Sequence, residues 1–237
     1  MKVLQMCRTA LIAAMILTPS SRLDLRGFAQ TNSRQGARTI ALVHGAWAEG
    51  SCWSKVIALL QAKGFHVVAV QNPLTSLADD VAATKRIIAL HDGPVILVGH
   101  SYAGVVITEA GNDPKVVGLV YVATFAPGEG ESINSVSKPY PPAPLGSELR
   151  PDAQGFLTAT PKGIAEDMAQ DLSSGEQEIL TATQGQTAAA VFGATVTRAA
   201  WKPVSAIGRW CWQFVQPALW YWSIPSSNGP VLLLLVS

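Results

Sequence analysis

One serine in this sequence has neighbours that suit a nucleophile. Ser101 lies in the run Gly99-His100-Ser101-Tyr102-Ala103-Gly104, directly after the apolar stretch 94–98. Small residues around a serine allow a strand and a helix to approach closely at a sharp turn, which leaves the hydroxyl free to attack. The usual pattern is G-x-S-x-G, so alanine at position 103 is a mild departure. The spacing predicts attack on an acyl group by Ser101.

A second segment could stabilise the negative charge that this attack creates. His44-Gly45-Ala46-Trp47 comes at the end of the apolar run 39–44. Backbone N–H groups of this segment, together with the N–H of Tyr102 at a helix start, would supply fixed donors to a developing oxyanion. We therefore expect both segments to meet at one site.

The elements that must position these segments alternate along the chain. Predicted strands are 39–44, 66–70, 94–98 and 116–124, and predicted helices are 51–63, 77–90 and 102–111. Strands that are apolar throughout are buried on both faces, and their alternation with helices indicates a parallel sheet. The pattern predicts an α/β fold.

The sequence changes in character after Phe125. Residues 138–144 are rich in proline, and 161–170 and 174–190 are predicted helices. We expect a helical cap inserted at about 126–200, over the carboxyl edge of the sheet, where α/β proteins bind ligands.

These motifs together resemble the bacterial α/β-hydrolase superfamily, particularly the branch with plant esterase-like and hydroxynitrile lyase-like enzymes. The resemblance is carried by His44-Gly45-Ala46-Trp47, Asn72-Pro73-Leu74, Gly99 to Gly104 and Phe125-Ala126-Pro127. It implies an α/β-hydrolase fold, with a mostly parallel sheet, flanking helices and a helical cap. It also implies a serine hydrolase that acts on a small ester or related acyl compound without a metal or cofactor. By this resemblance Ser101 is the nucleophile, and the amides of Ala46 and Tyr102 form the oxyanion hole.

The superfamily places an acid and then a histidine after the serine. All four histidines of this sequence precede Ser101, and its last acidic residue is Glu178. We therefore expect the last core strand and helix to be missing, as in a truncated or frame-shifted reading, with an atypical apolar tail at 209–237. A serine without a base keeps its proton, so impaired activity is expected.

Several nearby residues allow two interpretations. His44 could replace the missing base, although a histidine at a strand end is more often structural. His100 should point back into the fold, and Glu131 could replace the acid or be a solvated loop residue. Trp47 and Tyr102 could line a substrate pocket or pack in the core. We take His44, Trp47 and His100 as possible pocket residues.

Two other functions remain open at this point. A protein that has lost the triad could still bind small apolar ligands without turnover. A lyase could use the same pocket to cleave a cyanohydrin, although it also needs a histidine base.

Composition limits the partners. The net charge is +1, which offers no broad field for nucleic acid, so a small-molecule substrate is expected. Lys2, Arg8 and the apolar run 10–17 predict a signal peptide over 1–29, with cleavage after Ala29 or earlier, near Ser20. We expect an exported protein without a membrane span after signal removal and with an α/β-hydrolase domain over 37–237. The oligomeric state is left open.

Overall fold

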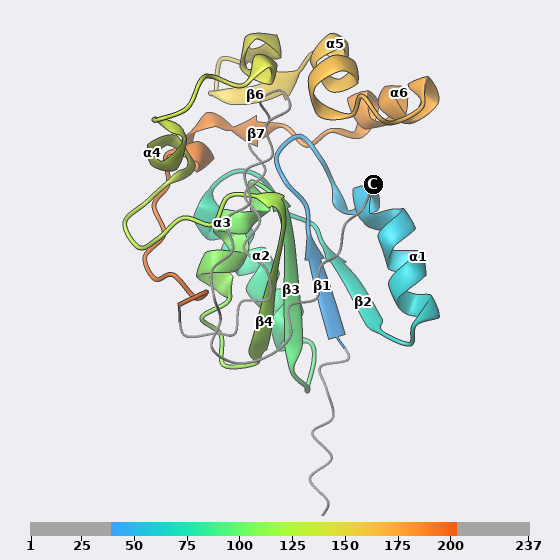
Figure 1. The fold of residues 1–237 in the computed structure, drawn as a ribbon, viewed down its shortest axis with the longest axis vertical. Coiled ribbons are helices and arrows are strands. Elements are labelled where there is room, and N and C mark those ends of the chain that lie inside the picture. The colour runs from blue at the N-terminus through green and yellow to red at the C-terminus, as the bar shows by residue number, and fades with distance from the viewer. Residues whose placement is uncertain (1–38, 203–237) are drawn as a thin grey trace, which may run out of the picture. The chain divides into compact units, whose positions relative to one another are not determined.

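Four parallel strands form the central sheet of residues 39–202, the part of the chain that the computed structural model describes (Figure 1). They are β1 (Thr39–Val43), β2 (His66–Val70), β3 (Val95–Ser101) and β4 (Val116–Thr124), in the order β2-β1-β3-β4. The predicted parallel sheet is confirmed. The predicted signal peptide (1–29) and apolar tail (209–237) lie outside the described residues.

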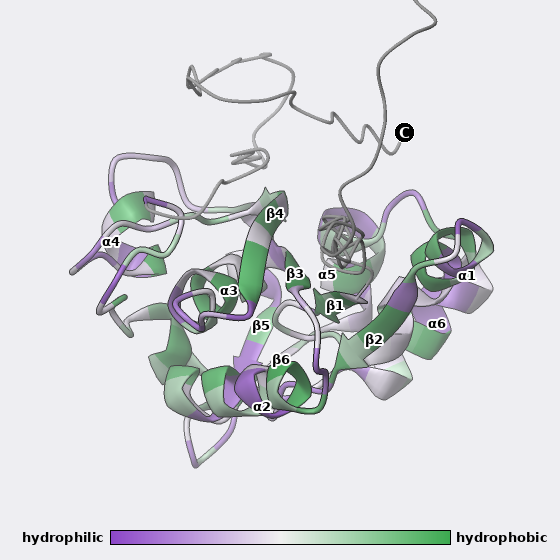
Figure 2. Cartoon of the chain, turned by 90° about the horizontal axis from the view of Figure 1, so that it is seen from below, coloured by the Kyte–Doolittle hydropathy of each residue, from purple (hydrophilic) through white to green (hydrophobic). Residues whose placement is uncertain are grey.

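Helices cover both faces of this sheet. They are α1 (Ser54–Ala62), preceded by the 3₁₀ turn η2 (Gly50–Trp53), α2 (Leu77–Ala89) and α3 (Ala103–Ala110). Ile40 and Leu42 of β1 pack with Trp53 on the side of α1, whereas Ala41 and Val43 belong to the core that contains α2 and α3. Figure 2 shows α1 on one side of the strands and the other two helices opposite. Alternate side chains of a buried strand thus serve two cores.

The boundaries follow from local chemistry. Ser76 caps α2 by accepting a hydrogen bond from the Asp79 amide at 3.1 Å, which satisfies a donor that the first helical turn leaves free. β2 and β4 match their predicted limits. The predicted helix at 51–63 begins one residue earlier, as the 3₁₀ turn, before it becomes α-helical.

A second layer of elements lies across the carboxyl ends of the strands (Figure 1). It contains α4 (Ile133–Ser137), η3 (Pro144–Glu148), β5 (Leu149–Pro151), β6 (Phe156–Ala159), α5 (Pro161–Gly163), the π-helical turn η4 (Ile164–Met168), α6 (Ser174–Thr183), β7 (Thr187–Ala188) and η5 (Ala189–Phe192). β5, β6 and β7 form an antiparallel sheet. We call this layer the cap; it is helical only in part.

The predicted helix at 174–190 is wrong beyond Thr183, where α6 ends. Gln184 turns back to β6, where its side chain accepts from the Ala159 amide at 2.8 Å and donates to the Ala159 carbonyl at 3.1 Å. A Cβ at Gly185 would come 2.7 Å from Leu74 Cδ1. Tertiary contacts therefore replace the helix that this alanine- and glutamine-rich segment would otherwise favour.

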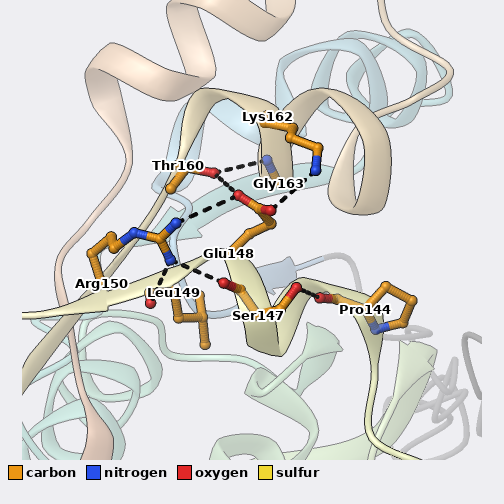
Figure 3. Close-up of polar contacts among 8 residues, drawn as sticks. All are labelled: Pro144, Ser147, Glu148, Leu149, Arg150, Thr160, Lys162 and Gly163. Atoms are coloured by element: carbon orange, nitrogen blue, oxygen red, sulfur yellow. Dashed lines mark hydrogen bonds and ion pairs between the residues drawn. The ribbon is translucent and has the colours of Figure 1, made fainter.

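A carboxylate near the protein surface ties the cap elements together (Figure 3). Glu148 accepts from the Thr160 hydroxyl at 2.5 Å and pairs with Lys162 at 3.3 Å and Arg150 at 3.9 Å. The Thr160 hydroxyl also accepts from the Gly163 amide at 3.0 Å. This network joins η3, β5 and α5.

In the described part of the chain, the helices are all too short or too polar to traverse a lipid bilayer.

Candidate active site

Ser101 occupies a strained turn between a strand and a helix. It is the last residue of β3, it has a φ of 54°, and Tyr102 directly after it is the N-cap residue of α3. A positive φ is uncommon for a residue with a side chain. Such an angle persists only where the surrounding structure enforces it, and residues of this kind cluster at functional sites. The predicted strand–turn–helix setting of Ser101 is therefore present.

Glycines allow three backbone segments to meet at this turn. A Cβ at Gly99 would lie 2.9 Å from the Ala103 carbonyl oxygen, and one at Gly104 would lie 1.9 Å from the Phe125 carbonyl oxygen. Ala103 is itself fully buried without such a conflict. Gly104 therefore carries the steric requirement, which explains why alanine is accepted at position 103.

The end of β4 also holds the turn. Thr124 is buried, and its hydroxyl donates to the carbonyl of Ser101. The pairing of β3 with β4 shifts register between His100 and Ser101, as expected where a bulge redirects a side chain.

The segment after β1 lies against Ser101. A Cβ at Gly45 would be 2.9 Å from Ser101 Cβ and 3.4 Å from Ser101 Oγ. The amide of Trp47 donates to the Thr187 hydroxyl at 3.1 Å, so this N–H is committed to the cap. Within His44–Trp47, the amide of Ala46 therefore remains the better candidate for an oxyanion donor, and the amide of Tyr102, next to α3, remains the second candidate.

His44 is structural in this arrangement. Its Nε2 accepts from the Asn72 amide at 2.9 Å, and its Nδ1 lies 2.9 Å from the Gly45 carbonyl. These partners require a neutral ring with the proton on Nδ1. Burial lowers the pKa of His44, which favours the same form. His44 is only 1% exposed, so the geometry favours the interpretation of His44 as a structural histidine over its use as a base.

The other imidazoles also point elsewhere. His100 packs edge-on to Trp53 with ring centres 6.3 Å apart, on the sheet face that α1 covers, which fits the expectation that it points back into the fold. His66 and His91 contact each other at 4.8 Å, and His66 begins β2 at the opposite edge of the sheet. Within residues 39–202, no hydrogen bond links an imidazole to the Ser101 hydroxyl.

Tyr102 belongs to the core and has a partner that the sequence did not reveal. It is fully buried, and its hydroxyl donates to Asp80 Oδ2 at 2.7 Å. Asp80 is also fully buried, and its Oδ1 accepts from the Leu74 amide at 2.8 Å. Burial raises the pKa of Asp80, while these two hydrogen bonds lower it. The sequence placed Asp80 only in the first turn of a helix, with no sign that it points inward.

Trp47 is largely buried and contacts the cap. It is 9% exposed, its indole Nε1 donates to the Leu157 carbonyl at 3.0 Å, and its ring stacks on Phe192 at 5.6 Å. Both partners belong to the cap, so the geometry fits the interpretation of Trp47 as a packing residue, one that joins the core to the cap.

The possible substitute acid, Glu131, serves its own loop. Its Oε2 accepts from the Gly128 amide at 2.6 Å, and its main chain pairs with Val196. This geometry fits the interpretation of Glu131 as a loop carboxylate. Among residues 39–202, no three histidine, cysteine or acidic side chains gather closely enough to hold a metal ion.

Fold and sequence together define the class. The alpha/beta hydrolase family matches residues 40–221 of this chain, and the chain belongs to that family. It is 35% identical over 118 residues to a carbendazim hydrolyzing esterase of Nocardioides sp. (strain SG-4G), covering 43% of this chain and 48% of the relative. It is 31% identical over 130 residues to methylesterase 8 of Arabidopsis thaliana, covering 46% and 48%.

Solved structures agree on the fold. A variant of tomato methylketone synthase I with bound β-ketoheptanoate superimposes with a TM-score of 0.62 at 20% identity, covering 72% of this chain and 77% of that one. The chain spans about half the length of the curated relatives that it matches. The lineage is that of esterase-type hydrolases.

Proposed function

We propose that this protein hydrolyses a small ester or related acyl compound, with Ser101 as the nucleophile. The observation that carries the proposal is the strained φ of 54° at Ser101 in a glycine-lined turn, with Gly45 packed against it. Such a turn holds one hydroxyl where it can attack, next to backbone N–H groups that can receive charge. The esterase relatives support the same reaction class.

The reaction divides the work among these residues. Ser101 Oγ bonds to the acyl carbon, and the electron pair of the C=O bond moves onto oxygen, where the amides of Ala46 and Tyr102 stabilise it. The alcohol then leaves, and water releases the acid from the acyl-serine. Each step needs a group that takes and returns a proton.

The group that would accept this proton is hard to identify in the 237-residue chain. His44 uses both ring nitrogens in the core, and His100 packs against Trp53. No histidine or acidic residue follows Glu178 in the printed sequence. We therefore propose that this chain, tested as it is, turns over slowly and responds to imidazole added to the buffer.

A fluorophosphonate probe and p-nitrophenyl acetate hydrolysis test the proposal. We expect probe labelling and slow hydrolysis that imidazole accelerates, with both lost in Ser101→Ala. Ser174→Ala, at an exposed serine of α6, is the matched control and should behave like the parent protein. The proposal fails if the folded protein is not labelled with imidazole present, or if Ser101→Ala responds to imidazole as the parent does.

Ligand binding without turnover is the second candidate, because the engaged nitrogens of His44 leave Ser101 without a base in residues 39–202. It predicts saturable binding of a small apolar ester with no serine-dependent hydrolysis. Hydrolysis that Ser101→Ala abolishes would reject it.

A further inference from the structure

The short strand β7 connects the cap to two loops of the core. The Thr187 hydroxyl accepts from the Trp47 amide at 3.1 Å, and the Ala188 amide donates to the Leu74 carbonyl at 2.9 Å. The same two residues pair with Leu157 and Phe156 of β6. β7 is therefore the junction between the cap sheet and the loops that follow β1 and β2.

Both core residues held by β7 are strained. Trp47 has a φ of 54° and Leu74 a φ of 59°. A residue with a side chain is unfavourable in such a region, so it persists only where surrounding contacts enforce it. For Trp47, the cap supplies both hydrogen-bond acceptors, Thr187 and Leu157, and the stacked ring of Phe192.

The Thr187 hydroxyl is well placed to enforce this geometry. It is fully buried, and it donates its own proton to the Gly185 carbonyl at 3.2 Å. Its oxygen is then oriented to accept from Trp47. Valine keeps the shape of threonine but cannot accept this bond, so it would leave a buried N–H without a partner.

We propose that Thr187 is a positioning residue for the oxyanion site, because it holds Trp47 and thereby fixes the peptide of the preceding Ala46. The inference rests on the proposed function of Ser101. Without the bond, Trp47 can relax toward negative φ, and the Gly45–Ala46 segment beside Ser101 moves with it. Through Thr187, the cap thus shapes the geometry of the oxyanion donors.

The test compares two ketones, only one of which forms a stable, negatively charged adduct with Ser101. An aryl trifluoromethyl ketone adds Ser101 Oγ to its carbonyl carbon; the C=O electron pair becomes an oxyanion, and the hydroxyl proton passes to imidazole in the buffer. The matching aryl methyl ketone binds without forming a stable adduct. The ratio of the two affinities reports on the oxyanion site, and fluorine NMR detects the adduct directly.

Four variants make the test specific. Losing one oxyanion donor costs about 10²- to 10³-fold, so a displaced donor in Thr187→Val should lower the affinity ratio about tenfold. Thr187→Ser keeps the acceptor and should retain the ratio. Thr183→Val, at an exposed α6 threonine whose hydroxyl bonds within its own helix, is the matched control. Trp47→Phe, which loses the bond to Leu157 but keeps a stacking ring, should lower the ratio by a smaller factor.

The outcomes separate the two proposals. If the parent forms no adduct, or if Ser101→Ala forms the same one, the proposed function fails and this inference falls with it. If the parent forms a serine-dependent adduct but Thr187→Val keeps the parent ratio, only the inference is overturned. An equal decrease of the affinity ratio in Thr187→Ser and Thr187→Val would also overturn the inference. Should Thr187→Val not fold, Thr187→Ala, which also lacks the hydroxyl acceptor, takes its place, and an unchanged affinity ratio in that variant decides against the inference.

Discussion

Removing the hydroxyl of Tyr102 should destabilise the protein by breaking one hydrogen bond to a buried carboxylate. In Tyr102→Phe the ring and the backbone amide remain, but Asp80 Oδ2 loses the donor that lies 2.7 Å away. Asp80 Oδ1 keeps the Leu74 amide at 2.8 Å. Because both side chains are fully buried, water does not replace the lost partner.

The expected cost follows from the charge on the acceptor. Hydrogen bonds to charged groups contribute about 1.5–3 kcal/mol. For a domain of this size each kcal/mol shifts the melting temperature by about 2–4 °C, so a decrease of about 3–12 °C is expected. Differential scanning calorimetry near neutral pH measures it.

The dependence on pH gives a sharper test. Burial raises the pKa of Asp80, and the Tyr102 bond lowers it, so this pKa should rise further in Tyr102→Phe. A raised pKa in the folded state lowers stability as pH rises from the unfolded pKa through the folded one. The deficit of Tyr102→Phe should therefore be largest above the folded pKa of Asp80 and should shrink on acidification, toward the value for a neutral hydrogen bond.

A second substitution provides the control. Asp80→Asn combined with Tyr102→Phe removes the buried charge while keeping an acceptor for the Leu74 amide. This double variant should be more stable near neutral pH than Tyr102→Phe alone. A melting temperature of Tyr102→Phe within about 1 °C of the parent, or a double variant no more stable than the single one, would refute the reasoning.

Three further predictions concern other parts of the chain. Gly104→Ala should unfold the protein or lower its melting temperature sharply, because the added Cβ would lie 1.9 Å from the Phe125 carbonyl oxygen. Gly175→Ala, in helix α6, is the control: no atom lies within 4 Å of the added Cβ, so the melting temperature should rise slightly. The hydrogen-exchange protection factors of residues 144–163, taken relative to the intrinsic exchange rate at each pH, should fall in acid, since the Thr160 bond and Lys162 lower the pKa of Glu148 and that stabilisation is lost as pH falls through it; Glu148→Gln should flatten this response. Mass spectrometry of protein secreted by a bacterial host should find a mature N-terminus after Ala29, and full-length retention would contradict the predicted export.

The elements that the sequence predicted well are those whose signal is local. β2 and β4 are unbroken apolar runs between turn residues, so their limits in the structure match the predicted ones. The turn at Ser101 was equally visible, because Gly99 and Gly104 mark the close approach of backbones on both sides.

The features that were missed depend on contacts between distant residues. The segment after Thr183 has a helical composition. Gln184 is instead hydrogen-bonded to Ala159, and Gly185 packs closely against Leu74. The Asp80 side chain points inward, where it accepts a hydrogen bond from the Tyr102 hydroxyl, 22 positions later in the chain. Neither pairing has a local signature that periodicity or motif spacing could reveal.

The junction at β7 has a consequence for engineering within this family. A cap transplanted from a relative would bring its own residues to the places of Thr187 and Ala188, while the recipient would keep the contorted loops at Trp47 and Leu74. Chimeras cut at the cap boundaries alone would thus separate each loop from the group that restrains it. Exchanging cap and loops together preserves the match, so a chimera should take these three segments from the same parent.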